Sequence, residues 1–411
     1  MAVTDTNVLS NSLQTLLQAD FIIAARRQYA YSQPPLIWAP PHAVLSQSNR
    51  AQTVSIPIYG HLKPSVTAIS QTADVSPITS WDKTISVTPD MYGQTVQLSQ
   101  KLQLTATPDV IRASAEQVAQ AAGESRDMLA RAQVIAGGVV IYGGDATSRA
   151  TVSAGSSTDE IDYADFLSGV TFLKGGRAPL LPGIGAGVAA ITRDAIVADM
   201  VEDGTIILVA EYGQHPEFLL NGEVGSHMAG ARIVVSNMAK IFQGAGTSAA
   251  ASSGALATAA AGGSTTFTLN SSVSSGGTGQ YWCVGAIEST GNNDQIGTET
   301  VFISGGSDTT VVTIVGAGAN AGFMYAHSSG ELVSHAYQVY TTIFMSAEAL
   351  LMCYTNEDGL GPDGIIYPPE EAGTLKQFTN LGYKQFLGFA RTAENRLFRV
   401  EHASARFTLG N

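Results

Sequence analysis

Several short segments carry side chains of the types that do chemistry, but none has the spacing of a complete site. The segment Gly183-Ile184-Gly185-Ala186-Gly187 looks like a dinucleotide-binding loop. It precedes a predicted strand instead of following one, and it lacks the final glycine spacing. The chain also has no Walker A, HExxH, GxSxG or EF-hand pattern. The sequence therefore does not support nucleotide binding or these hydrolase and calcium-binding classes.

Acidic and imidazole side chains give the next candidates, which are for metal binding. Asn356-Glu357-Asp358-Gly359 and Asp363 could gather a cation, but solvated loop acids are the favoured interpretation. The seven histidines are scattered, and His215-Pro216-Glu217 is typical of a helix entry. Asn270-Ser271-Ser272 matches a glycosylation sequon without a secretory signal. We predict no catalytic residue, no metal ligand and no cofactor, and hence no enzyme.

Arginine groups near the two ends are the candidates for nucleic-acid binding. Arg26-Arg27 form one group, and Arg residues close to Glu394 and Glu401 form another. Pairing with these acids, between subunits or on the surface, is favoured over reading of nucleic acid. The members of the second group are Arg391, Arg396, Arg399 and Arg406.

Composition limits the class of protein. The 411 residues are 45% hydrophobic, but only 13% are charged, and the net charge is −13. No Lys or Arg lies between Lys240 and Lys376, a stretch with eleven acids. Phosphate binding needs clusters of Lys and Arg, so a polyanion is not the default ligand. A polar surface with so few charges favours a protein that covers much of that surface by assembly.

Cysteine usage and hydropathy bear on the compartment. Cys283 and Cys353 are the only cysteines, which favours a reducing compartment and no disulfide framework. The segment Met1 to Asn11 lacks the apolar core of a signal peptide. No run approaches the roughly 20 apolar residues of a membrane span. We expect no association with a membrane.

The elements that must position these residues begin with a helix and a hairpin. Apolar spacing predicts a helix from Asn7 to about Tyr29, and paired prolines predict an extended segment over 32–49. Alternating residues predict strands over 52–63 and 91–104, and the strand pattern returns over 81–87 after the polar segment 64–77. A two-stranded hairpin is marginal alone, so we expect it to lie on another surface.

A long helix and an α/β region follow. Thr107-Pro108-Asp109 is a strong helix start, and Val110 to Ile135 has no breaker except Gly123. Strand and helix patterns then alternate from Val139 to Phe242, with Thr192 predicted to cap a helix. These patterns predict an α/β or α+β domain.

The last third of the chain reads as strands. Residues 243–263 are rich in Ala, Gly and Ser, as in a linker, and short strands separated by Gly-rich turns follow up to about 315. They predict a small all-β module whose ends lie close together. The earlier domain resumes near Val333, and 381–409 alternates as two strands around Ala393-Glu394-Asn395.

Several motifs together resemble one family. Phe218-Leu219-Leu220-Asn221-Gly222-Glu223-Val224-Gly225 and the following Ala229 to Asn237 resemble the shell-domain turn and strand of tailed-bacteriophage major capsid proteins of the podophage N-four coat-protein type. Further segments of this chain resemble other elements of the same family, and they occur in the same order. They are residues 7–15, Tyr92 to Ser99, Gln117 to Arg126, Leu381 to Lys384 and Arg399 to Glu401.

The resemblance implies an α+β fold, the Hong Kong ninety-seven (Johnson) capsid fold, with an inserted small all-β domain. A fused scaffolding domain looks absent, and no crosslinking partner can be assigned to Lys63 or Lys83. The implied segments are an N-terminal arm over 1–52, an E-loop hairpin over 53–90, a P-domain strand and spine helix over 91–140, an A-domain over 141–242, an inserted β-rich domain with its linker over 243–333, the continued A-domain over 334–378 and closing P-domain strands over 379–411.

The same resemblance implies a coat protein that self-assembles into pentamers and hexamers of an icosahedral head enclosing double-stranded DNA. Its partners would be copies of itself, through the E-loop and N-arm, together with portal, scaffolding and decoration proteins. Packaged DNA would be contacted only non-specifically. The protein would be made in the host bacterial cytoplasm and end in the virion. An encapsulin-like compartment shell and a β-rich phage tail or adhesion protein remain the alternatives.

The acidic module carries a further expectation. Residues 243–333 contain five acids and no Lys or Arg. Phosphates of packaged DNA would be repelled by such a surface. We therefore expect the module on the outer face of a shell, with a solvated knob of no role as the alternative.

Overall fold

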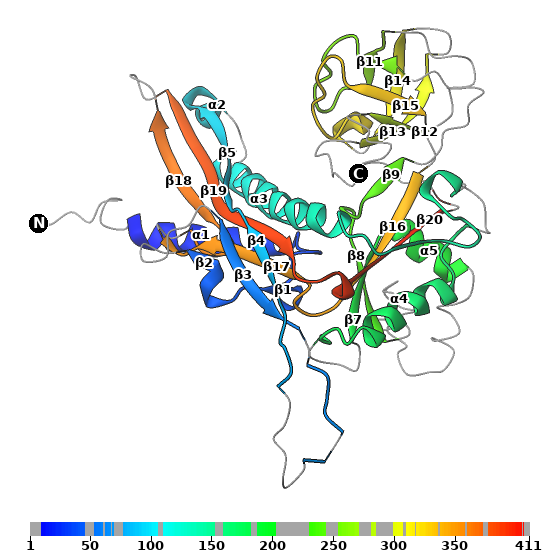
Figure 1. The fold of residues 1–411 in the computed structure, drawn as a ribbon. Helices are drawn as coiled ribbons and strands as arrows, with labels where there is room; N and C mark the ends of the chain where they lie inside the picture. Colours follow the sequence, from blue (N-terminus) through cyan, green and yellow to red (C-terminus); the bar gives the residue numbers. More distant parts are fainter. Residues whose placement is uncertain are drawn as a thin grey trace, which may run out of the picture. The chain divides into compact units, whose positions relative to one another are not determined.

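The structure is a computed structural model, drawn as a ribbon in Figure 1. The chain divides into two units. The first unit comprises Met1–Gln28, Trp38–Ser125 and Leu350–Thr392, and the second comprises Tyr29–Ile37, Arg126–Ala349 and Ala393–Asn411. The described residues are 10–45, 53–60, 62–66, 68–69, 77–105, 110–152, 159–181, 187–202, 230–243, 254–270, 281–284, 299–306, 310–316, 318–335, 338–357, 360–372, 377–404 and 406.

A six-stranded sheet forms the centre of the first unit. Its longest strand, β19 (Phe378–Arg391), pairs antiparallel with β5 (Asp90–Ser99), β17 (Leu350–Thr355) and β18 (Ile365–Ala372). The short strands β1 (Ile37–Trp38) and β2 (Val44–Leu45) both join β17. Ten residue pairs connect β5 to β19, so segments nearly 300 residues apart build one surface.

Two helices cover one face of this sheet. Phe21 of α1 (Ser10–Arg26) and Val118 and Ala122 of α3 (Val110–Ile135) share a core with Leu381 and Tyr383 of β19. The predicted long helix is confirmed over Val110–Ile135, while its predicted start at 107–109 lies outside the described residues. Small residues on α3 let α1 approach closely, because a Cβ added at Gly123 would lie 2.4 Å from the Ala25 carbonyl oxygen.

The predicted hairpin covers the opposite face. Strands β3 (Val54–Tyr59) and β4 (Asp82–Val87) pair antiparallel, from Val54 opposite Val87 to Tyr59 opposite Asp82. Their inward side chains pack with Phe386 and Ala390 of β19, which alternate with the residues that face the helices. The inward set is Val54, Ile56, Ile85 and Val87.

Two local predictions for the first 105 residues are wrong. The strand predicted over 91–104 ends at Ser99, where α2 (Gln100–Thr105) begins, because the Ser99 hydroxyl accepts the Leu102 N–H in a helix-starting turn. The segment predicted as extended over 32–49 contains two 3-10 turns, Pro34–Leu36 and Pro41–Ala43. In both turns proline occupies the first positions, where its fixed φ suits a helical turn.

A mixed sheet forms the core of the second unit. Its order is β6 (Val140–Tyr142), β20 (Leu397–His402), β16 (Gln338–Met345), β7 (Val188–Thr192) and β8 (Ala231–Val235), and β9 (Ile241–Gln243) also pairs with β16. Helices α4 (Tyr163–Gly175) and α5 (Asp194–Glu202) pack into the same core, where Phe166 meets Phe344 edge to face at 4.8 Å. The α+β prediction agrees with this content.

The prediction that Thr192 caps a helix is wrong. Thr192 is the last residue of β7, and its hydroxyl lies 2.9 Å from the Thr342 hydroxyl on the neighbouring strand β16. Helix α5 begins two residues later, at Asp194. The family-like turn at 218–225 lies outside the described residues.

Residues 254–335 form a separate six-stranded antiparallel sheet, called the β-module below. Its order is β10 (Gly254–Ala255), β15 (Leu332–His335), β12 (Tyr281–Val284), β13 (Glu299–Gly305), β14 (Val311–Val315) and β11 (Thr266–Thr268). Gly254 is opposite Val333, so the two ends of this segment lie side by side, as expected. A bridge from Leu256 to Leu269 joins the outermost strands, and closure of this kind removes exposed sheet edges.

The two large sheets do not follow the chain order. Residues 334–378 supply β16 to one sheet and β17 and β18 to the other, and residues 379–411 supply β19 and β20 to different sheets. Each sheet is therefore completed by strands that arrive late in the chain.

Candidate functional site

The residues predicted to be capable of chemistry do not come together. Gly183 to Ala186, the segment His215-Pro216-Glu217, Asp358 and Ser271 lie outside the described residues. Among the residues that the structure does describe, no three His, Cys, Asp or Glu side chains are grouped as a metal site. Within the same residues, every helix is too short or too polar to cross a membrane.

Asp363 is neither a cation ligand nor a solvated acid, and both interpretations of it are wrong. The residue is 6% exposed, and its Oδ2 accepts hydrogen bonds from Arg26 Nη2 at 2.7 Å and from Arg26 Nε at 3.2 Å. Asp363 therefore ties helix α1 to the loop before β18. Arg26-Arg27 is one of the predicted basic groups, and its Arg26 forms an ion pair with Asp363 of the same chain.

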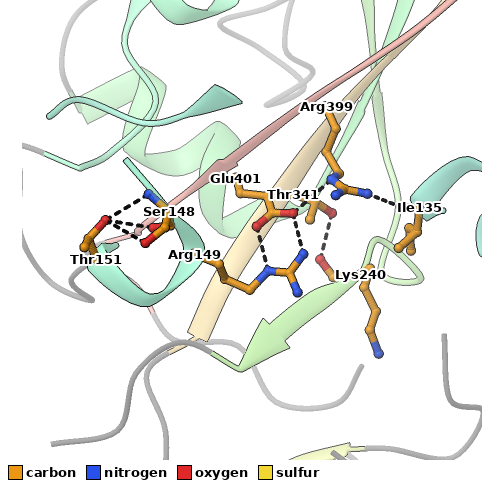
Figure 2. A network of polar contacts seen from close by, with 8 residues as sticks. All are labelled: Ile135, Ser148, Arg149, Thr151, Lys240, Thr341, Arg399 and Glu401. Atoms are coloured by element: carbon orange, nitrogen blue, oxygen red, sulfur yellow. Dashed lines mark hydrogen bonds and ion pairs between the residues drawn. The ribbon is translucent and has the colours of Figure 1, made fainter. Parts of the chain in front are cut away.

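Figure 2 shows a buried network of polar contacts around Glu401. Both Glu401 oxygens accept from Arg149, with Oε2 2.7 Å from Nε and Oε1 2.7 Å from Nη2. Arg399 Nε lies 2.9 Å from Glu401 Oε1, and Arg399 also donates to the Ile135 carbonyl. The expectation that these arginines pair on the surface or between subunits is wrong for Arg399, which is 5% exposed and pairs with Glu401 of the same chain. Burial lowers the pKa of Arg399, and the charge of Glu401 opposes that shift.

The same network is completed by an aromatic ring and by backbone. The Arg149 guanidinium lies 3.6 Å from the ring centroid of Phe242, a cation–π contact. Thr341 donates to the Lys240 carbonyl at 2.8 Å. These contacts connect β20, β9 and the turn 149–151 (Figure 2), and they engage the guanidinium groups of both Arg149 and Arg399. The cluster is a structural support inside this sheet, where β20 lies between β6 and β16.

His402 is the other ionisable side chain enclosed in this sheet. Its Nδ1–H donates to the Ala403 carbonyl at 3.0 Å, and Nε2 can then accept from the Thr342 hydroxyl at 2.9 Å. Burial lowers the pKa of His402 to about 4, although the hydrogen bond to Ala403 opposes the shift. The ring is thus neutral near pH 7 and acts as a hydrogen-bonded core residue.

Asp127 on α3 caps a turn of the preceding chain. Its Oδ1 accepts from the backbone N–H groups of Ala30, Tyr31 and Ser32 at 3.0, 2.8 and 2.9 Å, and from the Ser32 hydroxyl at 3.0 Å. Burial raises the pKa of Asp127, and these hydrogen bonds oppose it. The carboxylate satisfies three N–H groups that would otherwise be buried without partners.

The best candidate surface is the end of the β3–β4 hairpin. Val66 is 96% exposed and Ile69 is 76% exposed. The hairpin base is fastened by its four inward side chains, so this end is held out from a packed support. Exposed apolar side chains gathered on one element mark interaction sites. The other exposed apolar residues of the hairpin are Tyr59, Leu62, Ile78 and Trp81.

A groove of about 730 Å³ lies in the first unit between α1, α3 and β18. Its apolar lining includes Ile23, which is half exposed, and Ile111, Ala115 and Ile366. Charged side chains at its rim are Asp20, Arg27, Arg112 and Glu116. A groove with an apolar floor and a polar rim suits a polypeptide segment.

Only part of this picture follows from the sequence alone. The sequence predicts a polar segment between the two hairpin strands. This region nevertheless contains the apolar residues Val66, Ile69 and Ile78, which have no predicted strand or helix to pack on. The pairing of Arg149 with Glu401 was missed, since 252 residues separate them and nothing local connects them.

Comparison with known proteins rests on structure. No family model matches the chain, and no curated protein matches its sequence. The capsid of Ralstonia phage GP4 is similar over 92% of this chain and 92% of its own, with 10% identity and a TM-score of 0.51. The capsid structure of cyanophage P-SCSP1u is similar over 90% of this chain and 86% of its own, with 14% identity and a TM-score of 0.50. The chain therefore has the fold of these phage capsid proteins.

Proposed function

We propose that this chain is the major capsid protein of a tailed bacteriophage and assembles into pentamers and hexamers of an icosahedral head around double-stranded DNA. The observation that carries the proposal is the likeness to phage capsid chains along about nine-tenths of both partners. A likeness confined to one domain would fit many functions, whereas one that spans the chain includes the arm, the hairpin and both sheets.

Within this proposal the elements take the parts of a Johnson-type capsid subunit. Residues 1–52 are the N-terminal arm, 53–90 the E-loop, and α3 with β5 and β19 the spine and sheet of a P-domain. The sheet around β16 is an A-domain, and the β-module is an insertion into it. The shell is the place of action, so the protein is a virion component and not an enzyme.

The exposed apolar residues of the hairpin support self-assembly. A closed ring repeats one heterologous contact, so a single chain can supply both sides of each interface. Val66 and Ile69 on one subunit would be covered by a neighbouring copy, which removes the apolar surface that a monomer exposes. Portal, scaffolding and decoration proteins are further proposed partners, and DNA is contacted without sequence preference.

Electron microscopy of the expressed chain tests the proposal. Sedimentation and negative staining should show capsomer rings or closed shells, and particles from phage-producing cells should contain nuclease-protected DNA. A stable monomer that turns over a substrate would contradict it. Closed shells that contain cargo protein and no DNA would instead support an encapsulin-like compartment.

A further inference from the structure

His327 lies inside the β-module between two carboxylates. Its Nε2 is 2.7 Å from Glu299 Oε1, and its Nδ1 is 2.7 Å from Glu331 Oε2. The His327 side chain is 1% exposed and the Glu299 side chain 0%, whereas Glu331 is 28% exposed. The Phe323 ring packs edge to face on the imidazole at 4.8 Å.

With both glutamates present as carboxylates, only one protonation state of the ring satisfies this geometry. A carboxylate oxygen can only accept, so each ring nitrogen must donate, and both nitrogens carry protons only in the imidazolium. A neutral ring would turn one lone pair toward a carboxylate oxygen at 2.7 Å. It would also leave the buried Glu299 without a counter-charge, which is strongly unfavourable in a protein interior.

The sequence offers no substitute cation. Between Lys240 and Lys376 the only basic side chains are His327 and His335. The segment 254–270, which packs against His327, has no titratable side chain, so the titratable groups shown to face the ring are Glu299 from β13 and Glu331 from the turn before β15. Histidine is the one basic side chain whose ordinary pKa places the loss of its charge between pH 5 and 8.

The three side chains hold two segments in place. Glu299 also accepts from the Met324 and Tyr325 N–H groups at 2.8 and 3.2 Å, and Glu331 Oε1 accepts from the Ser328 N–H at 2.7 Å. The backbone of His327 exchanges two hydrogen bonds with Ala260, at 2.8 and 2.9 Å. The turn 324–331 and the segment 256–260 are thus joined to β13 through His327.

We propose that His327 makes the β-module sensitive to rising pH: the protonated ring links Glu299 to Glu331 and holds segments 256–260 and 324–331 against β13, and deprotonation releases them. Burial alone lowers the pKa of His327, but hydrogen bonds to Glu299 and Glu331 and their charges outweigh it, so the pKa is raised. With a raised folded pKa, the contribution is full below the ordinary histidine value of about 6.5 and is lost as pH rises through the folded pKa. The inference concerns the module itself and stands whether or not the chain forms a shell.

Hydrogen exchange of the full-length chain tests this. Protection factors, corrected for the intrinsic exchange rate at each pH, are measured from pH 5 to 10 for peptides covering 256–263 and 323–331. In the wild type, protection should fall at least about tenfold through one midpoint above the ordinary histidine pKa of about 6.5, while peptides of β16 and β20 keep theirs. Protection that is constant across this range overturns the proposal.

Three variants identify the titrating group. Glu331→Gln keeps an oxygen that accepts from Nδ1–H but removes a charge, so the midpoint should fall by about one pH unit or more. Glu370→Gln, at an exposed residue of β18 outside the module, and His335→Asn should leave it unchanged. A midpoint that ignores Glu331→Gln, or that moves with His335→Asn, assigns the transition to another group and overturns the proposal.

Discussion

At the scale of single residues, the decisive side chains are buried charges whose partners lie far away in the sequence. Glu401 illustrates this, because Arg149 and Arg399 both bind it in a nearly enclosed site. A buried pair adds little net stability over a well-packed apolar pair, but loss of one partner leaves an uncompensated charge. The consequence of a substitution therefore depends on burial more than on the charge that is removed.

Glu401→Gln should destabilise the second unit by about 3–5 kcal/mol, since two guanidinium groups lose their carboxylate. Urea unfolding monitored by hydrogen exchange in β16 and β20 measures the change. The matched control is Glu348→Gln, which removes a half-exposed carboxylate 3.6 Å from Arg396 and should cost less than about 1 kcal/mol. Equal effects of the two substitutions would show that the Glu401 network is not closed to water.

His402 should make the second unit sensitive to acid. Its pKa is lowered to about 4 in the folded chain. Below about pH 6.5 the ring therefore binds a proton in the unfolded chain but stays neutral in the folded chain until the pH approaches 4. This contribution to stability is therefore present above pH 6.5 and is lost as pH falls toward 4, by roughly 2 kcal/mol at pH 5.

The measurement is the difference in urea stability between wild type and His402→Gln at pH 7 and at pH 5. The variant lacks the titrating ring, so the stability advantage of the wild type should shrink by roughly 2 kcal/mol at the lower pH. An unchanged difference would mean that the ring is protonated without penalty in the folded chain.

At the scale of elements, two contacts determine how helices and strands meet in the first unit. Helix α1 crosses α3 where the latter has its only glycine, and the hairpin packs on the sheet through four side chains of alternating spacing. The first contact depends on the absence of a side chain, and the second on its presence. Both can be changed without touching the buried charges.

Gly123→Ala should destabilise the first unit by about 1–3 kcal/mol, because the new Cβ would lie 2.4 Å from the Ala25 carbonyl oxygen. In an isolated helix the same substitution would stabilise the helix by about 1 kcal/mol. The sign of the change in unfolding free energy therefore shows whether the contact with Ala25 is present. Gly175→Ala, where no atom lies within 4 Å of the added Cβ, is the control and should not destabilise. Thermal unfolding by circular dichroism distinguishes them, and a raised melting temperature for Gly123→Ala would contradict the crossing.

Replacing the exposed apolar residues Val66, Ile69 and Ile78 by serine should leave the folded subunit unchanged and block shell closure. These side chains are exposed in the subunit, so little packing is lost there, whereas an interface that buries them loses apolar area. Circular dichroism and the yield of particles on a gradient are the two readouts. Val311→Ser, at a half-exposed valine of β14, is the control; normal yields from the triple variant would remove the hairpin from the proposed interface.

At the scale of the whole molecule, charge is distributed unevenly along the chain. The stretch between Lys240 and Lys376 has eleven acids and no Lys or Arg, and it includes the entire β-module. If this acidic surface faced the interior of a DNA-filled head, the phosphates of the packaged DNA would repel it. The outward location of the module remains a prediction on this ground.

Protease access on intact particles tests the location. A Glu-specific protease should cut at Glu288, which lies in the part of the module sequence between β12 and β13, without opening the head. Trypsin serves as the internal control, since it has no cleavage site between Lys240 and Lys376. Cleavage that requires prior disruption of the head would place the module inside.

Local patterns in the sequence determined the elements. Apolar spacing and the Gly137-Gly138 stop gave α3 with its bounds, and alternation gave β3, β4, β14, β19 and β20 close to their observed ranges. These predictions hold because helix and strand periodicities are properties of neighbouring residues. Motif order along the chain was also sufficient to indicate a phage capsid fold.

Tertiary structure alone decided which segments meet. That Asp363 binds Arg26, that Arg149 reaches Glu401, and that Leu256 and Leu269 close the β-module all depend on contacts between residues distant in the chain. Residue types and spacing carry no such information, because a carboxylate in a loop reads the same whether it is solvated or buried against an arginine. The acidic stretch could be read from the sequence, but only the fold shows that its buried Glu299 is bound by a histidine.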